Sequence, residues 1–201
     1  HRNLLHRLLP RLISTFRFTG GHLKDKTMSQ YLKTYLFAEI AVRAEYNHNY
    51  LEKQCKDYET NQNPQLTIEV TADDIIKERS FSEDGESFSD GYIESLAFYR
   101  KFCEAIASRD VILFHCAAVA VDGKAYLFTA PSGTGKTTHI GLWQKIHGDK
   151  MTIVNGDKPL LKISKEKITV YGTPWDGKER QSTNTSADVA GICIINRGLE
   201  N

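Results

Sequence analysis

Apolar residues recur along the chain at two different spacings, and these spacings predict both strands and helices. Residues 66–70 alternate apolar and polar positions, which is typical of a strand. Residues 91–107 carry apolar side chains at helical spacing and predict one helix. Residues 71–78 open with a capping-box spacing and predict a short helix, while the polar stretch 80–90 predicts a loop. Residues 31–44, rich in aromatic and apolar side chains, are expected to hold one or two strands.

The second half of the chain predicts a sheet. The run Val111–Val121 is almost continuously apolar, and we interpret it as one strand buried on both faces. Asp122 and Gly123 predict a tight hairpin turn, after which Lys124–Phe128 returns as a partner strand. A glycine-rich segment and a helix to about Ile146 come next. Further strands are expected at 151–154, 160–163, 168–171 and 191–196, with a loop over 172–179. The fold class is therefore α/β, with a mixed sheet of the α+β kind.

Composition agrees with one globular domain. The chain has 201 residues, of which 40% are apolar and 25% charged. The longest apolar run is too short to cross a bilayer, so no membrane partner is expected. The four cysteines show no CxxC pair, which argues against a zinc site. Cys116 and Cys193 lie in apolar sequence and are interpreted as core residues, and we expect free thiols and a cytoplasmic setting.

Charge is distributed unevenly along the chain. Of 26 Lys/Arg and 25 Asp/Glu, six and one respectively lie in residues 1–27, so this segment carries +5 and the rest of the chain −4. A negatively charged domain repels the phosphate backbone of DNA and RNA, so nucleic acid is not an expected partner.

Residues 1–27 are interpreted as a basic extension outside the core, unpacked or disordered, and three origins stay open for it. An Arg-rich segment is typical of a targeting peptide. Leucines at helical spacing indicate a basic amphipathic helix. The third origin, sequence translated upstream of the true start, is favoured because the first Met is Met28. Residues 28–201 are then one domain, with an N-terminal α+β part (28–109) and a second part (110–201) that contains the glycine-rich segment.

The segment Ala130–Thr137 fits the phosphate-binding pattern G-x-x-x-x-G-K-[ST], with Ala in place of the first glycine. Gly133 and Gly135 allow successive N–H groups to face one point, and the following helix adds its positive end. Lys136 can reach the β- and γ-phosphates, and the Thr137 hydroxyl can bind Mg²⁺. The nucleotide-contacting residues are expected to be Ala130, Pro131, Ser132, Gly133, Thr134, Gly135, Lys136, Thr137 and Thr138.

Two more residues are candidates for chemistry beside this loop. The hairpin register, continued from the turn, places His115 opposite Ala130, next to the phosphates; a core histidine is the alternative. Asp157 follows an apolar strand, where a metal-binding or base carboxylate is commonly placed, although it also fits a simple turn. In the 172–179 loop, Trp175 and Lys178 either contact an acceptor substrate or only build a turn.

A P-loop entered through an antiparallel hairpin resembles the superfamily of HPr kinase/phosphorylase and PEP carboxykinase, in particular HPr-kinase-related proteins. The resemblance spans about 28–201 and rests on segments that match the family's motifs. These are Phe114–Ala118, Ser132–Thr137, Asn155–Asp157, Tyr171–Lys178 and Ser89–Leu96. The resemblance implies the C-terminal-domain fold of those kinases. Because the chain ends at Asn201, after a strand, we expect the C-terminal elements of these relatives to be absent.

The resemblance also implies an activity: an ATP- or GTP-dependent, Mg²⁺-requiring kinase that phosphorylates a hydroxyl, such as a Ser of a protein or peptide. Lys136, His115 and Asp157 would be catalytic, and Thr137 and Asp157 would bind the metal. Gly156 stands where the family has the first of two acids, which puts metal positioning in doubt. The alternatives are a non-catalytic nucleotide sensor and a PEP-carboxykinase-like enzyme. The sequence leaves the acceptor and the oligomeric state open, a homo-oligomer included.

Overall fold

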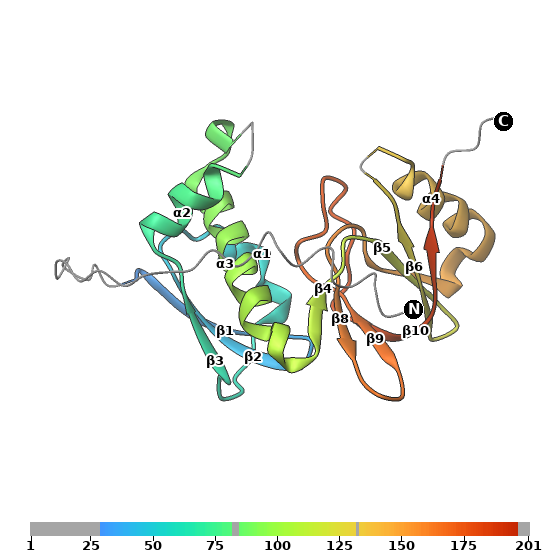
Figure 1. Ribbon diagram of the computed structural model, residues 1–201, viewed down its shortest axis with the longest axis horizontal. Coiled ribbons are helices and arrows are strands. Elements are labelled where there is room, and N and C mark those ends of the chain that lie inside the picture. Colours follow the sequence, from blue (N-terminus) through green and yellow to red (C-terminus); the bar gives the residue numbers. More distant parts are fainter. Residues whose placement is uncertain (1–28, 82–84, 132, 197–201) are drawn as a thin grey trace, which may run out of the picture.

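The computed structural model describes residues 29–81, 85–131 and 133–196. The predictions for residues 1–27 and for Ser132 lie outside these ranges. Figure 1 shows two sheets side by side, with α1, α2 and α3 beside the first and α4 packed on the second. The protein is thus mixed α/β, and among the described residues no helix is long and apolar enough to cross a membrane.

The first half of the chain forms a small sheet of three strands, in the order β1-β2-β3. Strands β1 (Tyr31–Phe37) and β2 (Ile40–Tyr46) are antiparallel, and β3 (Leu66–Glu69) lies parallel to β2. The segment 31–44, expected to hold one or two strands, therefore holds two, and the second continues to Tyr46. The short helix α1 (Tyr50–Gln54) and a 3₁₀ turn (Lys56–Tyr58) connect β2 to β3.

Two helices cover this small sheet, and both confirm their sequence signals. Helix α2 (Ala72–Arg79) begins with the expected capping box: the Thr71 hydroxyl accepts the Asp74 N–H at 3.2 Å, and the Asp74 carboxylate accepts the Thr71 N–H at 2.9 Å. Helix α3 (Asp90–Ile106) agrees with the predicted range to within one residue and begins at the N-cap Ser89. Short 3₁₀ turns lie at Gly85–Ser87 and Ala107–Arg109.

The second half forms a seven-stranded mixed sheet in the order β4-β8-β9-β10-β6-β5-β7. Its strands are β4 (Val111–Leu113), β5 (Ala117–Val121), β6 (Lys124–Thr129), β7 (Met151–Asn155), β8 (Leu160–Ile163), β9 (Ile168–Tyr171) and β10 (Ser186–Ile194). The predicted strands are present, although β10 begins five residues before Gly191. Helix α4 (Lys136–His147) packs on β5 and β7, and a 3₁₀ turn (Gly148–Lys150) leads from it to β7.

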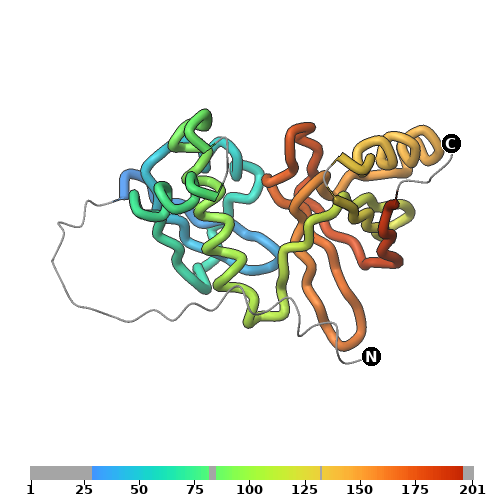
Figure 2. Tube along the Cα trace, turned by 45° about the horizontal axis from the view of Figure 1, so that its top comes forward, coloured from blue at the N-terminus to red at the C-terminus, as the bar shows by residue number. Residues whose placement is uncertain are grey.

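The single strand predicted over Val111–Val121 is wrong, because the structure divides it into β4 and β5. Residues 111–118 face the 155–162 segment in one register, from Val111 opposite Lys162 to Ala118 opposite Asn155, and the register shifts by one residue at Val119, which pairs with Ile153. Between the strands, the Phe114 and Cys116 N–H groups bond to Pro159 and Asp157 carbonyls. An apolar run does not reveal such an interruption. Figure 2 shows this chain segment passing along the middle of the molecule, between its two halves.

The β5–β6 hairpin confirms the predicted turn. Asp122 and Gly123 both have positive φ (49° and 76°), as a type I′ turn requires, and Val121 pairs with Lys124. The pairing ends at Ala117 with Phe128, so His115 and Ala130 are not the strand pair that the register predicted. The chain bends away at 114–116 to follow Asp157–Pro159, and only the Thr129 hydroxyl still reaches the His115 carbonyl, at 3.1 Å.

One apolar core joins the two halves. Side chains of the first sheet, α3, β4 and β8 form a continuous buried cluster with Trp175. Cys116 is fully buried, as predicted, whereas the prediction for Cys193 is wrong because this residue is exposed. Its neighbours Ile192 and Ile194 are also exposed, so described residues cover neither face of this end of β10.

Candidate functional site

The glycine-rich segment forms a tight loop between β6 and α4. Gly133 and Gly135 have positive φ (74° and 116°), a conformation that favours glycine. Position 130 does not require a glycine, because Ala130 is not among the described residues with positive φ. The residue types that the motif requires therefore match the backbone of this loop.

Helix α4 begins directly after this loop, at Lys136. Its N-cap is Gly135, and no side chain of the described residues caps the helix. The first N–H groups and the positive end of the helix dipole therefore face the loop, an arrangement that favours an anion. The Lys136 ammonium donates to the Ala130 carbonyl at 3.0 Å and so lies over the same loop.

His115 and Asp157 meet at the interruption between β4 and β5. The His115 Nε2 lies 2.9 Å from Asp157 Oδ1, and the Lys158 Nζ lies 2.5 Å from Asp157 Oδ2. Burial acts to raise the pKa of Asp157, but the hydrogen bond and charge of Lys158, followed by those of His115, outweigh it and the pKa is lowered. Asp157 is therefore held as a carboxylate.

The Asn155 side chain fixes the backbone turn that carries the Asp157 carboxylate. It is fully buried at the end of β7, and its Oδ1 accepts the N–H groups of Asp157 (2.8 Å) and Lys158 (2.7 Å). Its Nδ2 donates to the carbonyl and the hydroxyl of Thr173, at 2.8 and 3.1 Å. One amide side chain thus fixes the turn that carries Asp157 and connects it to Thr173.

The loop after β9 packs directly against this turn. Gly177 lies so close to Asp157 that a Cβ on it would be 3.1 Å from the Asp157 Cβ. The Gly156 N–H donates to the Gln181 carbonyl at 2.9 Å. A Cβ at position 156 would lie 3.1 Å from the Asp176 carbonyl oxygen, so this loop fills the space beside Gly156. Gly156 therefore has a local packing reason.

Trp175, in contrast, is mainly a core residue. Only 3% of it is exposed, and its ring stacks on Tyr99 with centroids 4.0 Å apart. It also contacts Phe37 and Phe98. We therefore assign Trp175 the anchoring of this loop, while Lys178 lies on the cavity side.

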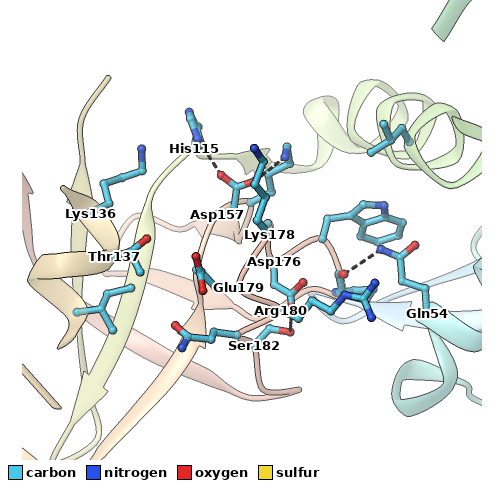
Figure 3. Close-up of a pocket in the computed structure, with 18 of the residues that line it drawn as sticks. Gln54, His115, Lys136, Thr137, Asp157, Asp176, Lys178, Glu179, Arg180 and Ser182 are labelled. Atoms are coloured by element: carbon cyan, nitrogen blue, oxygen red, sulfur yellow. Dashed lines mark hydrogen bonds and ion pairs between the residues drawn. The ribbon is translucent and has the colours of Figure 1, made fainter. Parts of the chain in front are cut away.

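A large cavity connects these features (Figure 3). Its volume is about 1150 Å³, which exceeds the usual range of about 300–1,000 Å³ for small-molecule sites. In Figure 3, Lys136 and Thr137 lie on one side, Gln54 and Arg180 on the other, and Asp157 lies between them with its contact to His115. The Gln54 side chain donates to the Pro174 carbonyl at 2.9 Å, which ties α1 to the loop on that far side.

The structure brings most of the predicted residues together around this cavity: His115, Gly133, Gly135, Lys136, Thr137, Asp157, Trp175 and Lys178 all line it. Neither Lys158, the buried Asn155 nor the wall formed by α1 and the N-terminal half of α3 was predicted as part of the site. Lys158 was detectable, because it lies next to Asp157 in the same turn. The α1 wall was not, because only the tertiary fold brings it to the loop.

The oxygen donors Thr137 and Asp157 suit Mg²⁺ by their chemistry, since this ion prefers hydroxyl, carboxylate and phosphate oxygens. Within the described residues, no three His, Cys, Asp or Glu side chains cluster as an all-protein metal site requires. This donor set fits an ion that is held largely by nucleotide phosphates.

No protein-family model matches the chain, and the search of curated proteins finds no match.

Proposed function

We propose that the protein is an ATP-dependent, Mg²⁺-requiring kinase that transfers the γ-phosphoryl group to a hydroxyl, such as a Ser of a protein or peptide. The observation that carries the proposal is the glycine loop and uncapped start of α4, with Lys136 over them, on the same cavity as the His115–Asp157 pair. One wall suits a polyphosphate, and the carboxylate–imidazole pair suits a reacting hydroxyl.

Each group has a role in this proposal. The loop amides, the start of α4 and Lys136 hold the β- and γ-phosphates. Thr137 and Asp157 would hold Mg²⁺, which supplies charge neutralisation on the phosphates when bound. The far side of the cavity, formed by α1 and the 174–184 loop, receives the acceptor.

The proton of the acceptor needs a base, and His115 or Asp157 can take it. His115 is favoured, because the low pKa of Asp157 makes its carboxylate a weak base. With Nε2 turned to Asp157, the Nδ1 of His115 is the atom that accepts the proton. The acceptor oxygen then bonds to the γ-phosphorus while the bond from that phosphorus to the β,γ-bridging oxygen breaks, and ADP leaves.

A single-turnover assay with γ-labelled ATP and a Ser-containing peptide pool tests this function. The proposal expects label on peptide with the wild type, and loss of label with Lys136→Ala. Equal labelling by both proteins rejects the assignment of Lys136 and its loop.

One observation favours a second candidate, a nucleotide sensor that does not transfer phosphoryl groups. Asp157 is already paired on both oxygens, and Gly156 offers no second carboxylate. A sensor binds nucleotide in equilibrium measurements but leaves all label on ATP in the same assay. The PEP-carboxykinase-like alternative predicts ATP consumption that depends on oxaloacetate.

A further inference from the structure

Lys158 is the cation closest to Asp157, and its backbone and side chain are held very differently. The Lys158 N–H donates to Asn155, and its carbonyl accepts from the Tyr99 and Thr173 hydroxyls, both at 2.8 Å. The side chain is 38% exposed, and its one ion pair within residues 29–81, 85–131 and 133–196 is with Asp157 Oδ2. Its ammonium can therefore move within the cavity while its backbone stays fixed.

The register of the strands explains why Lys158 faces the reacting groups. It lies opposite His115 across the 114–116 interruption, where the flanking bonds are Phe114 N–H to Pro159 and Cys116 N–H to Asp157. The two opposed side chains both turn to one carboxylate, His115 to Oδ1 and Lys158 to Oδ2. Both oxygens of the Asp157 carboxylate are therefore occupied, and an ammonium occupies Oδ2.

We propose that Lys158 is a mobile counter-ion of this site, which holds Asp157 before the metal–nucleotide binds and then moves to the transferred phosphoryl group. This inference rests on the proposed kinase function. An ammonium and a divalent cation repel each other at one carboxylate oxygen, so Lys158 leaves Oδ2 when the cation is taken up. Fixed by its backbone beside Asp157, its ammonium stays in the same cavity, where it neutralises the charge that builds on the phosphoryl oxygens during transfer and so acts on the rate.

The variant Lys158→Met tests the proposal through the affinity for a fluorescent ATP analogue, mant-ATP, with Mg²⁺ and with EDTA. Lys158 competes with the metal, so its removal should increase the Mg²⁺-dependent gain in affinity by about fivefold, the effect of one half-exposed ion pair. A merely structural role changes both affinities alike and leaves their ratio unchanged. Lys162→Met is the matched control: it removes a similarly exposed ion pair, with Glu39, outside the cavity, and should leave the ratio unchanged.

A second readout follows phosphate release from γ-labelled ATP to water in single turnovers. Lys158→Met should slow release by at least about 100-fold, and Lys158→Arg, which keeps the charge, should recover most of the rate. An unchanged or smaller Mg²⁺ gain, or a wild-type rate in Lys158→Met, overturns the counter-ion role while the nucleotide site stands. If the wild type does not bind mant-ATP at all, the kinase proposal fails first and this inference fails with it.

Discussion

Asn155→Ala removes the side chain that fixes the Asp157 turn, and the structure gives the size of its effect. The substitution deletes four hydrogen bonds, two from backbone N–H groups and two to Thr173. At about 1 kcal/mol net for each bond, the loss is roughly 4 kcal/mol. Water can still reach the half-buried Asp157 and Lys158 amides, so we expect a decrease of about 3 kcal/mol in the free energy of unfolding.

Urea unfolding followed by tryptophan fluorescence measures this change. With a slope of about 2 kcal/mol per molar urea, the midpoint should fall by about 1.5 M without a change of slope. Asn184→Ala is the matched control, because this exposed side chain makes one bond, to the Asp57 carbonyl, and should cost under about 0.5 kcal/mol. Equal midpoints for Asn155→Ala and Asn184→Ala would refute the role of Asn155 as the support of the turn.

Three further outcomes are expected. Lys136→Met should weaken mant-ATP binding by at least about tenfold, whereas unchanged affinity in a fluorescence titration would contradict its place over the phosphates. Trp175→Ala should lower the free energy of unfolding, measured in urea, by about 3–5 kcal/mol. Trp175→Phe should lower it far less, because the buried Trp175 Nε1 has no partner among the described residues. Equal losses in the two variants would contradict this. Burial raises the pKa of Cys116 from 9.0 to about 12 and that of Tyr46 from 10.0 to about 12. These groups ionise first in the unfolded chain, so stability should fall as pH rises above about 9; urea midpoints that stay constant to pH 11 would contradict this.

Local signals in the sequence predicted most of the elements. The capping box at Thr71, the Asp122-Gly123 turn and the apolar face of α3 are decided by neighbours within a few residues, and each is present. The glycine loop was also predictable from local sequence, because the motif itself requires glycine at the positions with positive φ.

The long-range features could not be predicted in this way. The division of 111–121 into β4 and β5 depends on the 151–162 segment, which lies far along the chain. The aromatic residue Trp175 is equally compatible in sequence with a substrate contact and with a core, and only its stacking on Tyr99 decides for the core. Cys193 is exposed because no described residue packs over the end of β10. A local sequence pattern cannot predict whether such a long-range contact forms.

If the loop between β6 and α4 holds a nucleotide polyphosphate, titration calorimetry will detect it. We expect saturable binding of Mg·ATP to the wild-type chain, with AMP, which lacks the β- and γ-phosphates, binding far more weakly. The absence of any heat with either Mg·ATP or Mg·GTP on folded protein would contradict it.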